Sequence, residues 1–152
     1  MTLSVTSPAF KSGSPIPAVY TCKGDNTSPA LSWTDPPSNT KSFALTMDDP
    51  DAPGGIWVHW VIYNIPASAR GLQVAAPAKA QLTDDSLNGV NSWGKLGYGG
   101  PCPPSGTHRY FFKLYALDTL LDLASGANKQ QVLSAMQNHI LAQGELMGTV
   151  SK

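Results

Sequence analysis

The stretch that decides the fold is residues 42–65, SFALTMDDPDAPGGIWVHWVIYNI. Its first part, Ser42–Asp48, alternates along a predicted strand, with Phe43, Leu45 and Met47 on one side and Ala44, Thr46 and Asp48 on the other. Its last part, Ile56–Ile65, is rich in β-branched and aromatic residues, which is typical of a strand buried on both faces. The loop between them holds two prolines and two glycines. The stretch therefore predicts a β-hairpin.

Other strands and one helix are predicted outside this hairpin. Tyr110–Leu117 is a third strong strand, and Leu3–Thr6 and Ala30–Trp33 are weaker ones. Asn128 and Gln131 have the spacing of a helix N-cap with its capping-box partner. Apolar residues then recur at helical spacing, and Gly144 supplies a stop. They are Val132, Leu133, Met136, Ile140 and Leu141. We expect a single turn over 66–72 and an irregular connection over 75–91.

Composition indicates one domain, residues 1–152, of the all-β class. The chain has 14 glycines and 13 prolines, which fall between short apolar runs and read as turns. Ten basic and ten acidic residues cancel, so the chain lacks the basic surplus of a nucleic-acid-binding protein. It also lacks an apolar stretch long enough to cross a bilayer.

The N-terminus favours a cytoplasmic protein, because Met1–Phe10 has neither the charged start nor the apolar core of a secretory signal. A periplasmic chain whose signal has been removed would look the same. Cys22 and Cys102 are too few for a disulfide framework or a structural zinc site. They could pair if the fold brings them together, but a reducing compartment favours two free thiols.

Three segments carry the candidate site. Asp48, Asp49 and Asp51 lie within four residues and repel one another, so we expect hydrogen bonds or positive charges to compensate them. Aspartate beside proline is also ordinary turn chemistry. In the next strand, period two places His59 on one face with Trp57, Val61 and Tyr63. A lone histidine in an apolar strand is most often a core residue, but the hairpin could return His59 to Asp49.

The third segment is the glycine- and proline-rich stretch 97–106, which leads into His108-Arg109-Tyr110. His108 and Tyr110 share one face of the strand, and Arg109 lies on the other. We expect Arg109 to pair with one of the aspartates behind the pocket. For Tyr110 alone, core packing is the default interpretation.

Together these three segments resemble the phosphatidylethanolamine-binding protein family, which includes the Raf kinase inhibitor protein. The likeness extends to residues 22–33, CKGDNTSPALSW, and to residues 135–141, AMQNHIL, and the chain looks like the shorter bacterial branch. The resemblance implies a two-sheet antiparallel β-sandwich with Greek-key character, one docked C-terminal helix, and a small pocket for phosphate-like anions.

The resemblance also implies the site residues. The ligand-binding positions are Asp49, His59, His108 and Tyr110, with Pro53, Trp57 and Gly100 on the rim. Asp51 and Arg109 are expected to support the pocket, and no metal or cofactor is implied. Imidazoles and a phenol hydroxyl can donate to an anion. If a neighbouring carboxylate raises the histidine pKa values, binding weakens above about pH 7.

Other functions stay open at this stage. The same pocket could take a phosphorylated or carboxylate group of a partner protein, as in an inhibitor of a kinase or protease. A metal site built from two histidines and a carboxylate, or a nucleophilic Cys102 with His108, would instead make an enzyme. Because a ligand-pair motif and an orienting third group are missing, we expect no catalysis. His139 is interpreted as a structural residue near the end of the helix. Exposed aromatics such as Trp93 and Tyr98 are candidates for a dimer interface.

Overall fold

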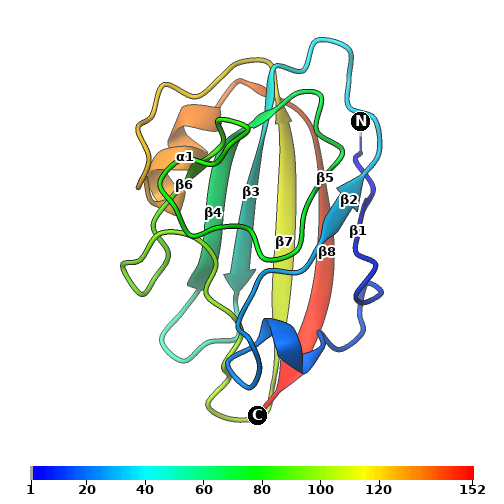
Figure 1. Ribbon diagram of the computed structural model, residues 1–152, viewed down its shortest axis with the longest axis vertical. Helices are drawn as coiled ribbons and strands as arrows, with labels where there is room; N and C mark the ends of the chain where they lie inside the picture. The colour runs from blue at the N-terminus through cyan, green and yellow to red at the C-terminus, as the bar shows by residue number, and fades with distance from the viewer. Residues whose placement is uncertain (1) are drawn as a thin grey trace.

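Two antiparallel sheets and one α-helix make up the fold (Figure 1). The computed structural model describes residues 2–152. The five-stranded sheet has the order β6-β4-β3-β7-β8, and the three-stranded sheet has the order β1-β2-β5. The larger sheet comprises β3 (Ser42–Asp49), β4 (Trp57–Pro66), β6 (Leu87–Asn88), β7 (Thr107–Leu117) and β8 (Ile140–Ser151). The smaller one comprises β1 (Val5–Thr6), β2 (Leu31–Trp33) and β5 (Gly71–Leu72). A 3-10 turn, η1 (Ala18–Tyr20), and helix α1 (Lys129–Met136) complete the chain.

The predicted fold class is confirmed. The neighbours β6-β4-β3-β7 follow the Greek-key order, apart from the excursion through β5 between β4 and β6. β3 lies between its hairpin partner β4 and the later strand β7, and all eight of its residues are buried. Residues 42–65 therefore form the middle of the larger sheet.

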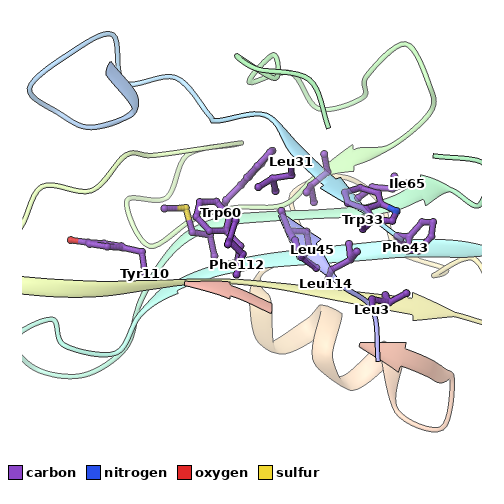
Figure 2. Packing of buried hydrophobic residues seen from close by; sticks show 14 of the residues in the cluster. Leu3, Leu31, Trp33, Phe43, Leu45, Trp60, Ile65, Tyr110, Phe112 and Leu114 are labelled. Atoms are coloured by element: carbon purple, nitrogen blue, oxygen red, sulfur yellow. The ribbon is translucent and has the colours of Figure 1, made fainter. Parts of the chain in front are cut away.

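Two hydrophobic clusters lie on opposite faces of β3. Phe43, Leu45 and Met47 belong to the main core, which fills the space between the two sheets. Figure 2 shows this core on one side of β7 and the helix on the other. Ala44 belongs to the second cluster, together with Val132 and Met136 of α1. The alternation predicted for this strand is thus the division between the two clusters.

Helix α1 begins as predicted but ends earlier. The Asn128 side chain accepts from the Gln131 backbone, and the Gln131 side chain accepts from the Asn128 backbone, which is the predicted capping box. The helix stops at Met136, and Asn138 takes a left-handed φ of 69°, which asparagine tolerates. None of the helices within residues 2–152 is long and apolar enough to span a membrane.

The expectation that Ile140, Leu141 and Gly144 complete this helix is wrong, because they lie in β8. That strand pairs with β7 in eleven register positions, and this long pairing overrides the helical spacing. Gly144 is not a stop: a Cβ there would lie 2.1 Å from the carbonyl oxygen of Leu3. Nor is His139 helical. It lies in the turn before β8, where its Nδ1 is 2.7 Å from the Asp118 carboxylate.

The expectation of two free thiols is also wrong. Cys22 and Cys102 form a disulfide that joins segments 80 residues apart in sequence. One cysteine follows η1 and the other lies in the glycine- and proline-rich loop before β7, and Figure 1 shows both segments at the lower end of the molecule. The N-terminus suggested a reducing compartment, but no local pattern around Cys22 or Cys102 indicates that the fold brings these two loops together.

Candidate functional site

The predicted site residues lie at one end of the larger sheet. β3 finishes at Asp49, β4 begins two residues before His59, and β7 begins one residue before His108. These strand ends meet at the lower end of the view in Figure 1. The antiparallel pairing of β3 with both β4 and β7 therefore brings three distant segments together.

A β-bulge sets the direction of His59. Met47 pairs with Trp60 and Asp48 pairs with Val58, so His59 is the extra residue on β4. Such an extra residue interrupts the alternation of a strand and re-aims its side chain. His59 accordingly contacts Tyr110, whereas Val61 and Tyr63 join the cluster under α1. The period-two prediction that His59 shares a face with Val61 and Tyr63 is therefore wrong.

Each of the three neighbouring carboxylates has its own partner. The partners are Lys129 Nζ for Asp48 at 2.7 Å, His108 Nδ1 for Asp49 at 2.7 Å, and Arg109 Nη2 for Asp51 at 2.9 Å. The Asp51–Arg109 pair is bidentate, and the Arg109 backbone N–H adds a third bond to Asp51. These bonds lower the pKa of Asp51 from 3.8 to about 2. The expected compensation of the carboxylates and the expected pairing of Arg109 with one of the aspartates are both present.

Asp49, His108 and Tyr110 form a buried group on the core side of the sheet. Asp49 accepts from His108 Nδ1 with one oxygen and from the Asp51 backbone N–H with the other. The Tyr110 ring lies 5.1 Å from the ring of His59 and 6.4 Å from that of His108, measured between centroids. Tyr110 therefore sits between the two imidazoles. Figure 2 shows its oxygen pointing away from the rest of the core.

His59 is held by the backbone of the loop before β7. Its Nδ1 lies 2.7 Å from the Gly99 carbonyl oxygen, so Nδ1 carries the proton and donates. Burial lowers the pKa of His59 below its usual 6.5, outweighing the Gly99 bond and the Asp49 charge, which raise it. The neighbouring carboxylate raises this pKa as expected, but the expected net increase is wrong, because desolvation is the larger effect.

Several polar atoms near this group lack partners. The Tyr110 hydroxyl and Trp57 Nε1 are buried and have no hydrogen-bond partner in the part of the chain that the structure describes. Burial, and next the nearby Asp49 carboxylate, raise the pKa of Tyr110, and its hydroxyl has no hydrogen-bond partner within 3.5 Å among residues 2–152. Both imidazoles use Nδ1, which leaves Nε2 free of protein partners within residues 2–152. Buried donors without acceptors are uncommon in folded proteins, and they call for a ligand or water.

The predicted rim residues differ in placement. Gly100 is buried, and its N–H donates to the Asn26 side chain at 2.9 Å, where a Cβ would clash with Asn26 and with the Tyr20 carbonyl. Trp57 is half-buried and packs edge-on against Trp93. Pro53 is exposed in the loop between β3 and β4. The structure thus holds Gly100 firmly and leaves Pro53 at the surface.

Sequence reasoning missed Asn26 and the carbonyl of Gly99, and it treated Trp93 only as a dimer candidate. Trp93 is 45% exposed and packs edge-on against His59, 5.1 Å between ring centroids. Tyr98, the other aromatic residue predicted for a dimer interface, is mostly buried, because it packs on Trp60 and donates to the Tyr20 carbonyl. The segment NSWG before the glycine-rich loop is a turn signal, and this signal could have placed Trp93 near the site.

Two features bear on the enzyme alternatives. Across residues 2–152 no cluster of three or more His, Cys, Asp or Glu side chains has the arrangement of a metal site. Cys102 is part of the disulfide and carries no thiol that His108 could activate.

The chain is similar to known proteins over almost its whole length. A family model described as phosphatidylethanolamine-binding protein matches residues 6–151. A UPF0098 protein of Methanothermobacter thermautotrophicus is 55% identical over 92% of this chain and 93% of its own length. A UPF0098 protein of Chlamydia muridarum is 45% identical over 97% of both chains.

Solved structures agree with these relatives. The crystal structure of CT736 from Chlamydia trachomatis, described as a putative phosphatidylethanolamine-binding protein homologue, superposes with a TM-score of 0.91 at 42% identity, covering 99% of this chain and 98% of that one. The structure of E. coli YbcL, described as a member of the mammalian PEBP family, gives 0.90 at 35% identity, covering 100% and 99%. The chain therefore belongs to the phosphatidylethanolamine-binding protein family.

Proposed function

We propose that this protein binds a small oxyanion, inorganic phosphate or a phosphorylated group, between His59, His108 and Tyr110, and that it does not catalyse a reaction. The observation that carries the proposal is the buried Tyr110 hydroxyl, which has no hydrogen-bond partner among residues 2–152. A buried polar group without a partner costs about 1–3 kcal/mol. An anionic oxygen in contact with it would recover that free energy.

The two imidazoles make binding depend on protons. In both side chains Nδ1 is committed to an oxygen, Gly99 O or Asp49 Oδ2. In a neutral imidazole the other nitrogen, Nε2, is then an acceptor. An anion can therefore use Nε2 either after the imidazole takes up a second proton or by bringing a proton itself. We expect phosphate binding to be accompanied by proton uptake and to strengthen as the pH falls below about 6.5.

The test replaces Tyr110 by phenylalanine. Without ligand, Tyr110→Phe should leave the free energy of unfolding unchanged or raise it by about 1 kcal/mol, because an unpaired hydroxyl is removed. Phosphate affinity, measured by isothermal titration calorimetry, should fall roughly tenfold. Titration in two buffers of different ionisation enthalpy measures the proton uptake.

Tyr63→Phe is the matched control. The Tyr63 hydroxyl donates to the Ala124 carbonyl and accepts from the Ala127 N–H, so its loss should destabilise the protein and leave phosphate affinity unchanged. The proposal fails if wild-type protein binds no phosphate at pH 6, or if both tyrosine variants bind it as tightly as the wild type.

The disulfide bears on where the protein acts. Disulfides persist in oxidising compartments and are rare in the cytosol of mesophiles. The Cys22–Cys102 bond therefore supports a periplasmic or extracellular site of action over the cytoplasmic one expected from the N-terminus. Alkylation of thiols in intact cells before lysis tests this, because a cytosolic pool would be trapped largely as free thiols.

A further inference from the structure

A hollow lined by charged and apolar residues lies on the face of the larger sheet that carries α1, opposite the face of the proposed phosphate site. It has a volume of about 140 Å³, and Asp48 and Lys129 are among the residues that line it. Helix α1 covers Ala44, Val61 and Tyr63 on this face. Asp48 lies on the same side of β3 as Ala44, two alternate positions further along the strand. The hollow is therefore distinct from the site around His59 and His108.

Asp48 is a buried carboxylate with one unused oxygen. Its side chain is 5% exposed, and Oδ2 accepts from Lys129 Nζ at 2.7 Å. The other oxygen, Oδ1, is buried and has no hydrogen-bond partner from Thr2 to Lys152. Since an ionised carboxylate can accept several hydrogen bonds, this oxygen lacks a donor. A group that reaches it must bring an N–H or O–H.

Two further charges in the hollow are unpaired. Lys113 of β7 and Glu145 of β8 are cross-strand neighbours. Neither has an ion-pair partner within 4.0 Å among residues 2–152. Lys113 Nζ instead lies 5.9 Å from the centre of the Phe111 ring. The hollow therefore holds an ammonium without an ion-pair partner beside a buried carboxylate oxygen that lacks a donor.

The hollow also has an apolar wall and room to extend. Ile56, which is 60% exposed, contributes to its lining together with Pro50 and Phe111. Lys113 and Glu145 also line a neighbouring hollow of about 600 Å³ beside the N-terminal segment. A ligand held by its charged groups near Asp48 would have space for a short side chain.

We propose that this hollow binds a small free α-amino acid, with its ammonium donating to Asp48 Oδ1 and its carboxylate accepting from Lys113. The charges of the hollow select for a zwitterion. A simple anion would meet the carboxylates of Asp48 and Glu145, and a simple cation would meet the ammonium groups of Lys113 and Lys129. A neutral molecule that carries both charges complements both sets.

The test is an NMR titration of the full chain, ¹⁵N-labelled, with L-alanine, L-serine and L-valine in turn. Saturable chemical-shift changes are expected for the backbone amides of Asp48, Phe111, Lys113 and Glu145. Acetate and methylammonium, which each carry half of the charge pattern, should bind roughly tenfold more weakly than alanine. Lys113→Met should weaken alanine binding roughly tenfold. Lys11→Met, which removes an exposed lysine elsewhere, should leave it unchanged.

Tyr110→Phe separates this inference from the proposed phosphate site, because alanine affinity should not change in that variant. The inference is overturned if none of the three amino acids gives saturable shifts up to about 50 mM. It is equally overturned if acetate alone binds as tightly as alanine, or if the shifts centre on His108 instead of Lys113.

Discussion

Asp48 and Asp49 are consecutive, equally buried at 3% exposure, and face opposite sides of the same strand. Asp48 pairs with Lys129 of α1, and Asp49 pairs with His108 of β7. A lysine ammonium is a compact charge at the end of a flexible stem, and its bond to Asp48 ties the helix to the sheet. An imidazole has a second nitrogen, so His108 can bind Asp49 and still present Nε2 to a ligand.

Asp48 and Asp49 also differ in how many of their carboxylate oxygens accept hydrogen bonds from the protein. Both oxygens of Asp49 accept hydrogen bonds from the protein, so this carboxylate is placed to orient His108. One oxygen of Asp48 is free, so this carboxylate can itself receive a donor. Although the two side chains are similarly buried, Asp49 is placed to orient His108 on one face, whereas Asp48 is a candidate ligand contact on the other.

Lys129→Met is expected to cause the largest change, a decrease in the free energy of unfolding. Removing one partner of a buried ion pair leaves an uncompensated charge and typically costs 3–5 kcal/mol. Because Lys129 is 21% exposed, we expect a loss near the lower end, about 3 kcal/mol. Urea unfolding measures it. The double variant Asp48→Asn with Lys129→Met should recover at least half of the loss. If Lys129→Met is as stable as the wild type, Asp48 reaches solvent and the comparison breaks down.

Asp49→Asn should weaken phosphate binding more than it lowers the stability of the fold. Without the carboxylate, His108 loses its fixed tautomer and any favourable charge interaction with the protonated ring. We expect phosphate affinity at pH 6 to fall roughly tenfold to a hundredfold, as for the loss of a hydrogen bond to a charged group. Asp48→Asn is the matched variant one residue away and should bind phosphate within about twofold of the wild type. Equal losses in both variants would mean that net charge, and not the Asp49–His108 contact, controls binding.

Much of this arrangement was predictable from the sequence, because the strands concerned have strong local patterns. The alternation of Phe43, Leu45 and Met47 identified the core face of β3, and the capping box at Asn128 identified the start of α1. The grouping of Asp49, His59, His108 and Tyr110 came from a family resemblance. The structure brings these four residues together, while their role as ligand contacts stays a prediction.

The features that were missed depend on contacts between distant segments. The bulge at His59 appears only when β4 is aligned with β3, so strict period two placed the side chain on the wrong face. The start of β8, Ile140 and Leu141, was predicted to be the end of the helix, although residues 142, 144, 146, 148 and 150 are small or apolar at alternate positions. That alternation was a usable signal. The cysteine pairing and the bond from His59 to Gly99 depend on loop placement that no local pattern encodes.

His59, on the face of the sheet that carries Asp49, should make the stability of the protein depend on pH. Its folded-state pKa is lowered, so the unfolded chain binds more protons below about pH 6.5 and the folded protein loses stability as the pH falls. One such group contributes at most about 1.4 kcal/mol per pH unit. His59→Asn, which can still donate to Gly99, should make stability fall less steeply as the pH drops below about 6.5, by no more than this amount. Urea unfolding at several pH values checks it, and an unchanged slope in His59→Asn would show that His59 is not the titrating group.

The smallest effect is expected at the third carboxylate, Asp51, whose pair with Arg109 lies at the surface. Its pKa is lowered to about 2, so its stabilisation is complete above pH 4 and is lost as the pH falls through 2. The Arg109 side chain is 53% exposed, and exposed pairs contribute little. Asp51→Asn should lower the Tm at pH 7 by about 2 °C or less, and the difference from the wild type should vanish near pH 2. A loss as large as that of Lys129→Met would mean that Asp51 holds the loop against the sheet. The division of roles among the three aspartates would then need to be redrawn.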